Sequence, residues 1–366
     1  MPGLYIHIPF CVRKCAYCDF YSLPARDSSI GAYVDAVLRE SSAYSGLSFN
    51  TLYLGGGTPS LLGAENLKRL LDGLSRTFDL SRLAEATIEV NPESATAELL
   101  ETAGETEINR VSIGVQSLSD YELKSVGRMH DAAQAIQAIV RAKELGVDSV
   151  SCDVIVGLPG QNWQTLRATL ETLTGFGVQH LSVYCLSLEE GTPLASNPPA
   201  DLPSDDEQAE LFAQASAFLE KSGFAHYEIS NFALKGHECQ HNLNYWRGGE
   251  YLGLGPSAAS HLNGKRFKNR ADLDAYLANP AGLAEDVEEL GAKEKSAEEA
   301  MLRLRLLAEG LDVSELARRF GFAEELLARL NSMVEEGLLN CDGSVYRLPA
   351  SLVLTSNPIF ARVLGD

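Results

Sequence analysis

The sequence predicts an α/β protein in which a partial barrel of six βα units is followed by a mainly helical C-terminal domain. Short β-rich segments alternate with longer amphipathic segments through the first two thirds of the 366 residues, which is typical of a parallel sheet covered by helices. From about Gly291 the pattern becomes helical. Six units are fewer than the eight that close a barrel, so we expect an open, curved barrel.

The expected strands are short runs of mainly apolar residues between the amphipathic segments. They are Leu4–Ile8, Thr51–Leu54, Ala86–Val90, Arg110–Val115, Asp148–Val156 and His180–Cys185. The expected helices have apolar residues at helical spacing. They are Tyr33–Tyr44, Glu65–Leu74, Ala132–Leu145, Trp163–Leu173 and, after the prolines 198, 199 and 203, Glu207–Lys221.

The C-terminal segment predicts three helices and a short hairpin. The helices are expected at Ala300–Leu307, Val313–Phe320 and Glu324–Val334, and the strands around Leu339 and Tyr346, separated by Asp342-Gly343. This order resembles a winged helix. We expect three regions: a barrel over residues 1–205, an extension of the barrel over 206–290, and the winged-helix-like domain over 291–366.

The charge of the chain argues against nucleic acid as a partner. Thirty basic residues stand against 50 acidic ones, which gives a formal net charge of −20 and long-range repulsion of polyanions. For the same reason we expect the winged-helix-like segment to be a packing domain. The N-terminal residues lack the order of a secretion signal and no apolar run approaches the length of a membrane span, so we expect a cytoplasmic protein.

Three of the seven cysteines lie within eight residues, and they are the strongest signal in the sequence. Cys11, Cys15 and Cys18 directly follow the first expected strand, so they lie on a loop at its C-terminal end, where barrels place their chemistry. Iron–sulfur clusters ordinarily use four thiolates. Three local thiolates leave one iron of a 4Fe–4S cluster open, and an open iron can chelate the amino and carboxylate groups of S-adenosylmethionine (SAM).

Zinc is the alternative ligand of these thiolates. A structural zinc ion takes four ligands, and His7 is the nearby candidate for the fourth. We favour the cluster, because His7 is expected inside a strand and no second cysteine pair follows. Cys152, Cys185 and Cys341 fall in expected strands, where we expect them to pack in the core.

The Cys-x-x-x-Cys-x-x-Cys loop after Tyr5-Ile6-His7-Ile8-Pro9-Phe10 resembles that of radical SAM enzymes. Across essentially all 366 residues the chain resembles the oxygen-independent coproporphyrinogen oxidase group and, within it, the HemW-like haem chaperones. The matching motifs are Gly55-Gly56-Gly57-Thr58-Pro59, Glu89-Val90-Asn91-Pro92, Ser112-Ile113-Gly114-Val115-Gln116-Ser117, Gly127-Arg128-Met129-His130, Asp153 with Gly157-Leu158-Pro159-Gly160, and His241-Asn242-Leu243-Asn244-Tyr245-Trp246.

The resemblance implies a set of SAM contacts. They are Tyr5, Tyr17, Gly56, Gly57, Thr58, Glu89, Gln116, Arg128, Asp153 and Ser187. The residues themselves suit the role, because polar groups at the C-terminal ends of barrel strands point into the mouth of the barrel. A glycine loop lets backbone groups approach a ligand closely, and the fork of Arg128 suits a carboxylate.

Within the family, the sequence favours the chaperones over the decarboxylating oxidases. The cysteine motif of those oxidases resembles Cys-x-x-x-Cys-x-x-Cys-x-Cys. In this chain Phe20 stands where the last cysteine of that motif would be. Those oxidases also carry an extension before the first strand. In this chain the first strand is expected to begin within four residues of Met1. The first hypothesis is therefore a haem chaperone that carries a 4Fe–4S cluster and SAM. The alternative is an oxygen-independent coproporphyrinogen III oxidase, and an unrelated radical modification also stays open.

His241 is the candidate haem contact, because a neutral imidazole is a usual axial ligand of haem iron. Tyr245 and Trp246 can pack at a porphyrin edge. The alternation of His237, Cys239 and His241 also allows three ligand-type side chains on one strand face, which we consider the weaker alternative.

The resemblance further implies an electron donor for the cluster and acceptor haemoproteins as recipients of haem. It also implies transient contact with those acceptors that are membrane-bound, and a homodimer. No residue pattern in the sequence points to dimerisation.

Overall fold

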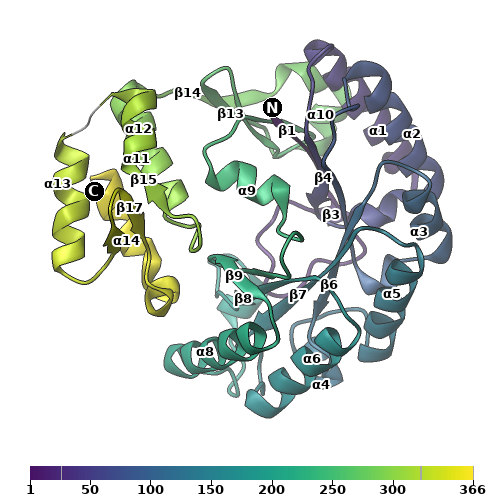
Figure 1. Cartoon of the computed structure of the whole chain (residues 1–366). Helices are drawn as coiled ribbons and strands as arrows, with labels where there is room; N and C mark the ends of the chain where they lie inside the picture. Colours follow the sequence, from purple (N-terminus) through teal and green to yellow (C-terminus); the bar gives the residue numbers. More distant parts are fainter. Residues whose placement is uncertain (26, 322–323, 366) are drawn as a thin grey trace.

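In the computed structural model, which describes residues 1–25, 27–321 and 324–365, a curved twelve-stranded sheet forms the barrel (Figure 1). Six adjacent parallel strands make up its core. They are β1 (Gly3–Ile8), β4 (Thr51–Gly56), β5 (Glu85–Val90), β6 (Arg110–Gln116), β7 (Ser149–Val156) and β8 (His180–Cys185). All six expected strands are confirmed, with ends that differ by at most two residues.

Helices cover the outer face of the parallel strands (Figure 1). They are α1 (Asp27–Ser41), α2 (Gly63–Thr77), α3 (Ala97–Gly104), α4 (Asp120–Ser125), α5 (Ala132–Glu144), α6 (Trp163–Gly175) and α8 (Asp205–Lys221). The local sequence explains their starts. Asp131 and Gln134 form a capping box at α5, and Ser204 and Glu207 form one at α8, just after Pro203.

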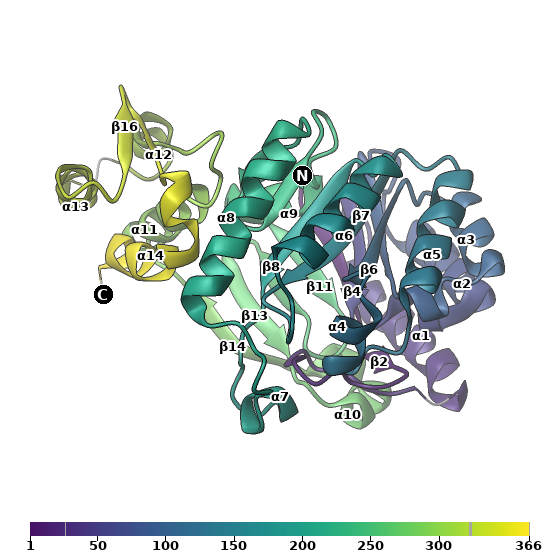
Figure 2. The same ribbon diagram turned by 90° about the horizontal axis from the view of Figure 1, so that it is seen from below.

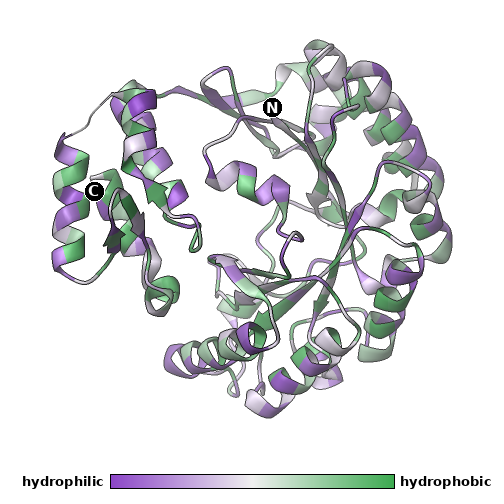
Figure 3. Cartoon of the chain, viewed as in Figure 1, coloured by the Kyte–Doolittle hydropathy of each residue, from purple (hydrophilic) through white to green (hydrophobic). Residues whose placement is uncertain are grey.

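Further strands extend the parallel sheet at both edges. At the β8 edge are β10 (Asn231–Ala233) and β9 (Ala225–Glu228); at the β1 edge are the parallel β11 (Tyr251–Leu254) and the antiparallel β12 (Ala259–Leu262), β13 (Lys265–Asn269) and β14 (Ala284–Glu289). The apolar core strands contrast with the polar β14 (Figure 3). Helix α9 (Gln240–Trp246) lies on the concave side of the sheet (Figure 1).

The end of the chain folds as the expected mainly helical, winged-helix-like domain. Its elements are α11 (Ala292–Arg303), β15 (Leu311–Asp312), α12 (Val313–Phe320), α13 (Glu324–Glu335), β16 (Asn340–Asp342), β17 (Val345–Arg347) and α14 (Ser356–Leu364). The three strands pair in the order β15, β17, β16. The backbone N–H of Leu307 donates to the carbonyl of Tyr227 at 3.0 Å, which ties this domain to the barrel.

Three local predictions are wrong. Helix α11 ends at Arg303 and begins at Ala292, eight residues before the expected start, because its first turns are polar and lack apolar periodicity. Cys239 and His241 do not alternate on a strand, since Cys239 precedes α9 and His241 lies in it. Cys152 is buried in β7 and the half-buried Cys185 packs against the core, both as expected, but Cys341 is exposed.

The remaining short elements include two small strands beside the barrel mouth. The bounds are β2 (Phe10–Cys11), β3 (Leu23–Pro24), α7 (Pro193–Ser196) and α10 (Leu273–Ala278). Strand β2 lies at the same end of the barrel as α4 and α7 (Figure 2). Among the helices of the described residues, none combines the length and the apolar character that crossing a bilayer requires.

A buried carboxylate joins α1 to the β11–β13 edge. Glu40 is 3% exposed and accepts hydrogen bonds from the backbone N–H of Gly255 at 2.9 Å, Asn269 Nδ2 at 2.6 Å and the Tyr276 hydroxyl. Burial raises the pKa of Glu40 from 4.5 to about 7, although these three bonds oppose the rise.

We expect Glu40→Gln to flatten the pH dependence of stability. With its raised pKa, the folded protein holds this proton more tightly than the unfolded chain between pH 5 and 7. The free energy of unfolding therefore falls as pH rises, by up to about 1.4 kcal/mol per pH unit from this group alone. Urea unfolding at several pH values measures the slope. The exposed Glu65→Gln is the control, and an unchanged slope in Glu40→Gln would contradict the account.

Candidate functional site

The loop that carries the three cysteines is held at both ends and in the middle. At its ends, the N–H of Leu23 donates to the carbonyl of Pro9 at 2.7 Å, and the N–H of Ala25 donates to that of Cys11 at 2.9 Å. In the middle, the N–H of Ala16 donates to the carbonyl of Val126 at 3.1 Å. These bonds fix the cysteine loop over the C-terminal ends of the barrel strands, where barrel sites lie.

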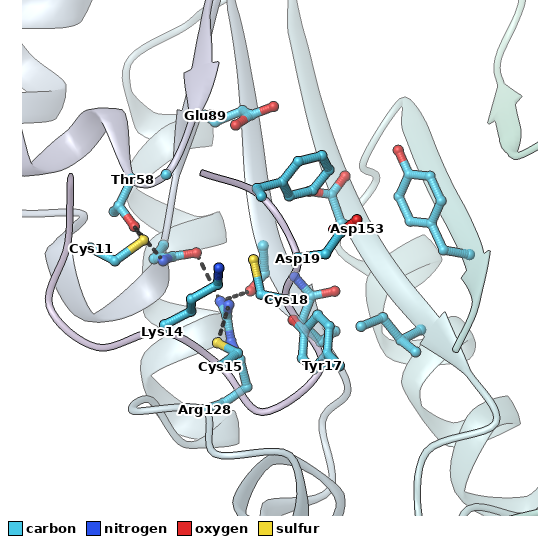
Figure 4. A pocket seen from close by; sticks show the side chains of 18 of the residues that line it. Cys11, Lys14, Cys15, Tyr17, Cys18, Asp19, Thr58, Glu89, Arg128 and Asp153 are labelled. Carbon is cyan, nitrogen blue, oxygen red and sulfur yellow. Dashed lines mark hydrogen bonds between the residues drawn. The ribbon is translucent and has the colours of Figure 1, made fainter. Parts of the chain in front are cut away.

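The cysteine loop forms one wall of a pocket with a volume of about 480 Å³. Figure 4 shows Cys11, Cys15 and Cys18 on the loop, with Glu89 and Asp153 on strands of the barrel. The three cysteines and nine of the ten expected SAM contacts line it: Tyr17, Gly56, Gly57, Thr58, Glu89, Gln116, Arg128, Asp153 and Ser187. Tyr5, the tenth, lies in a neighbouring cavity beside His7 and Tyr245.

A chain of hydrogen bonds links two of the thiols through the barrel (Figure 4). The Thr58 hydroxyl donates to Cys11 Sγ at 3.5 Å, and Asn91 Nδ2 donates to Thr58 Oγ1 at 3.0 Å. Arg128 Nη2 donates to Asn91 Oδ1 at 2.8 Å, and Arg128 Nη1 donates to Cys15 Sγ at 3.6 Å. Two of the three thiols are therefore oriented by donors from other segments of the barrel.

Arg128 also makes bonds to the barrel. Its Nη2 donates to the carbonyl of Gly114 at 2.7 Å, so this guanidinium joins the cysteine loop to Asn91 and to β6. Its Nε has no hydrogen-bond partner among the described residues. The contact of Arg128 with a carboxylate of SAM stays a prediction.

The glycine loop also bonds mainly to protein. The N–H of Gly57 donates to the carbonyl of Ile8 at 2.8 Å, and that of Thr58 donates to Phe10 at 2.7 Å. A Cβ on Gly57 would lie 2.6 Å from the Phe10 oxygen, so a larger residue cannot fit without moving the cysteine loop. These two N–H groups hold the cysteine loop, while the approach of other backbone groups of the glycine loop to a ligand stays a prediction.

Gln116 reaches the pocket through an irregular strand end. Its φ is +64°, a left-handed conformation that is costly for a residue with a side chain. The pairing of β6 with β7 shifts register between Ile113 and Gln116 at the same point. Such irregularities re-aim side chains next to binding sites, and here one turns Gln116 into the pocket.

Two half-buried carboxyl groups, of Glu89 and Asp153, line the inner wall of the pocket. Tyr53 donates to Glu89 Oε1 at 2.7 Å, and Ser112 donates to Asp153 Oδ1 at 3.4 Å. Burial raises the pKa of Glu89 to about 7, and the nearby Asp153 adds to the rise. Burial likewise raises the pKa of Asp153 to about 6. A cation bound between them offsets this cost, and SAM carries a sulfonium and an ammonium group.

His7, the fourth ligand of the zinc alternative, is turned away from the thiols. Its Nε2 donates to the carbonyl of Tyr21 at 2.9 Å, and its Nδ1 lies 3.0 Å from the Tyr5 hydroxyl. Among the described residues, no three His, Cys, Asp or Glu side chains converge on a point where one ion could be held. The three cysteines line the pocket together.

His241 is buried beneath the concave face of the sheet. Its Nδ1 lies 2.8 Å from Thr51 Oγ1, and its Nε2 lies 2.7 Å from the Tyr245 hydroxyl. The Glu85 carboxylate accepts the N–H of His241 at 3.0 Å and fixes the start of α9. Burial lowers the pKa of His241 to about 3, so the ring is neutral, but both of its nitrogens are engaged.

Asn91 is the site residue that the residue-by-residue prediction missed. It bridges Thr58 and Arg128 and lines the pocket, although only its motif was noted. Its place two residues after Glu89 was the available signal, since side chains two apart in an extended chain share a face.

Comparison with known proteins agrees with this geometry. The family model described as "Radical SAM superfamily" matches residues 5–173. A curated relative from Lactococcus lactis, named "Heme chaperone HemW", is 33% identical over 99% of this chain and 97% of its own length. Relatives of the same name are 33% identical in Bacillus subtilis, over 100% of both chains, and 35% identical in Escherichia coli, over 92% of this chain and 91% of the relative.

The chain belongs to the HemW family of radical SAM proteins. Membership implies a 4Fe–4S cluster and SAM as cofactors. Among solved structures, the coproporphyrinogen III oxidase HemN from Escherichia coli matches with a TM-score of 0.85. It is 22% identical, and the match covers 100% of this HemW-family chain and 89% of the oxidase, so the two share a fold.

We expect Glu89→Gln to have opposite effects on stability and on SAM affinity. Without SAM, removing this poorly solvated charge should raise the free energy of unfolding at pH 8 by about 2 kcal/mol. With SAM, losing the carboxylate opposite the cation should weaken binding by roughly tenfold or more.

Thermal unfolding and calorimetric titration with SAM measure the two effects. The exposed Glu98→Gln is the matched control. If Glu89→Gln binds SAM as tightly as the control does, the carboxylate does not face the ligand.

Proposed function

We propose that this chain is a haem chaperone, which binds haem and delivers it to acceptor haemoproteins. The full-length similarity to relatives named haem chaperones carries the proposal. In the proposal, the cluster and SAM are needed for the transfer-competent state and not for porphyrin synthesis. An electron donor for the cluster is part of it, while homodimerisation and contact with membrane-bound acceptors stay predictions of the resemblance.

The residue two positions after Cys18, Phe20, supports a chaperone over an oxidase. Phe20 is 64% exposed and borders both the cysteine-lined pocket and the neighbouring cavity. In the motif of the decarboxylating oxidases that this chain resembles, a cysteine stands at this place. An exposed phenyl ring between two cavities suits contact with a flat apolar ligand.

Each part of the pocket has a role in the proposal. Cys11, Cys15 and Cys18 hold the cluster, and Glu89 and Asp153 face the positive charge of SAM. Thr58, Asn91 and Arg128 orient two of the thiols through their hydrogen bonds. When bound, the cluster and SAM supply one-electron chemistry, which the protein positions. Tyr17, Gly56, Gly57, Gln116 and Ser187 complete the SAM contacts, and Tyr5 is carried over from the resemblance although it lies outside the pocket.

His241 enters the proposal from the resemblance. For this ring to ligate haem iron, at least one of its hydrogen bonds with Thr51 and Tyr245 must first break. Tyr245 and Trp246, from the same motif, already line the neighbouring cavity.

We expect the anaerobically reconstituted protein to bind haem and to pass it on. Titration with haem should give a saturable change of the Soret band. With SAM present, the haem-loaded protein should load the apo form of a b-type cytochrome faster than haem-loaded serum albumin does. Absence of a Soret change, or transfer no faster than from albumin, would contradict the proposal.

The same preparation separates chaperone from oxidase. Incubated anaerobically with coproporphyrinogen III, SAM and a chemical reductant, it should form no protoporphyrinogen. Formation of that product would favour the oxidase.

A further inference from the structure

Tyr53 on β4 connects the cysteine-lined pocket to helix α9. Its hydroxyl donates to Glu89 Oε1 at 2.7 Å, and Glu89 lines the pocket. Its ring stacks on that of His241 in α9, with ring centres 5.1 Å apart and planes inclined by 27°. This half-buried side chain therefore contacts both an expected SAM contact and the histidine of the C-terminal motif.

The alternation of side chains along β4 produces this arrangement. Thr51 and Tyr53 are two residues apart on the strand, so their side chains share one face of the sheet. Both contact the His241 ring, because Thr51 Oγ1 lies 2.8 Å from its Nδ1 while Tyr53 stacks on it. Strand β5 pairs in parallel with β4 and brings Glu89 beside the end of that strand. The register thus places Glu89, Tyr53 and His241 in a row.

Tyr53 is closely packed on two sides. A Cβ atom on residue 55 would lie 2.9 Å from Tyr53 Cε1 and 3.1 Å from Glu89 Oε1, so the glycine here leaves room for their hydrogen bond. The ring centre of Tyr5 lies 6.3 Å from that of Tyr53 and 6.5 Å from that of His241. In such packing Tyr53 cannot shift without changing its contact with His241.

The hydrogen bond from Tyr53 depends on the charge of Glu89. Loss of solvent around this carboxyl group raises its pKa to about 7, so it is partly protonated at neutral pH. A cation beside Glu89 favours its charged form, which is the stronger hydrogen-bond acceptor. Glu89 therefore holds the Tyr53 hydroxyl more firmly when a cationic ligand such as SAM is bound.

The His241 ring is the second partner of Tyr53. Thr51 and Tyr245 occupy its two nitrogens, and ligation of haem iron requires one of these bonds to break. When Glu89 holds Tyr53 more firmly against the face of this ring, the ring is less free to leave its two partners. The same contact therefore opposes ligation of haem iron by His241.

We propose that Tyr53 is a positioning residue that couples the SAM pocket to α9. SAM bound at Glu89 favours the observed arrangement of Tyr53 and His241, and so weakens haem binding and favours haem release to an acceptor. By linkage, haem weakens SAM binding by the same factor. This inference rests on the proposed function, in which His241 contacts haem.

Haem titration of the reconstituted full chain, without reductant, tests the coupling. The dissociation constant for haem is measured with and without saturating SAM. In the wild type, SAM should raise this constant at least about fivefold. Tyr53→Phe keeps the ring but loses the bond to Glu89, so the ratio of the two constants should fall to about one. Because the ratio is taken within one variant, a uniform change of haem affinity does not alter it.

Tyr276→Phe is the matched control. It removes a hydroxyl that donates to another carboxyl group, that of Glu40, and Tyr276 lines neither cavity. This variant should keep the ratio of the wild type. The proposal is overturned if SAM leaves haem affinity unchanged in the wild type, or if Tyr53→Phe keeps the same ratio as Tyr276→Phe.

Hydrogen exchange of α9 distinguishes the two proposals, because it requires no haem. SAM alone should slow amide exchange over Gln240–Trp246 in the wild type and not in Tyr53→Phe. Unchanged exchange in β6 and β7 shows that the variant is folded. If the wild type binds no haem, the proposed function fails, and the exchange of α9 still tests Tyr53. If SAM does not slow this exchange in the wild type, the coupling is overturned even where haem binds.

Discussion

The site depends on the parallel pairing of β1 with β4, because this pairing sets the cysteine loop against the glycine loop. His7 pairs with Gly55 and Ile8 pairs with Gly56, so the chain leaves both strands at the same edge. Gly57 and Thr58 then donate their N–H groups to Ile8 and Phe10. A Cβ atom on residue 57 would lie 2.6 Å from the Phe10 carbonyl oxygen, so the two loops are too close for any side chain at this position.

From this contact a chain of hydrogen bonds extends across the barrel. Thr58 is hydrogen-bonded to Cys11 and to Asn91, which follows β5. Arg128 is hydrogen-bonded to Asn91 and to Cys15. The carboxyl groups of Glu89 and Asp153 are half-buried, and loss of solvent around them raises their pKa values. A pocket that combines such acids with donors to sulfur suits a cationic ligand beside a thiolate cluster.

The concave side of the sheet borders a second cavity beside the cysteine-lined pocket. Arg110 and Glu85 are both buried and lie 3.8 Å apart, and Glu85 also caps α9. This anchor holds Tyr245 and Trp246 at the edge of that cavity. The two cavities therefore share Phe20 as a border and rest on neighbouring strands of one sheet.

Much of this arrangement could be predicted from the sequence, because it follows from local patterns. Short apolar runs in the sequence predict buried parallel strands. Because Cys11 follows the first of these strands, its place at the C-terminal end of β1 could be predicted as well. The hydrogen-bond partners of the individual polar side chains could not be predicted. Whether Arg128 holds a ligand or Cys15, and whether His241 is open or enclosed by Thr51 and Tyr245, depends on contacts between distant segments. The start of α9 was missed for the same reason, since Glu85, 155 residues earlier, caps it.

The central claim is that Cys11, Cys15 and Cys18 hold a 4Fe–4S cluster whose fourth iron is open to SAM. Electron–nuclear double resonance on the reduced, reconstituted protein tests it most directly, using SAM labelled at its amino nitrogen and carboxylate oxygens. The account predicts hyperfine coupling of both labels to the cluster. A fully assembled cluster that shows no coupling to either label would contradict it.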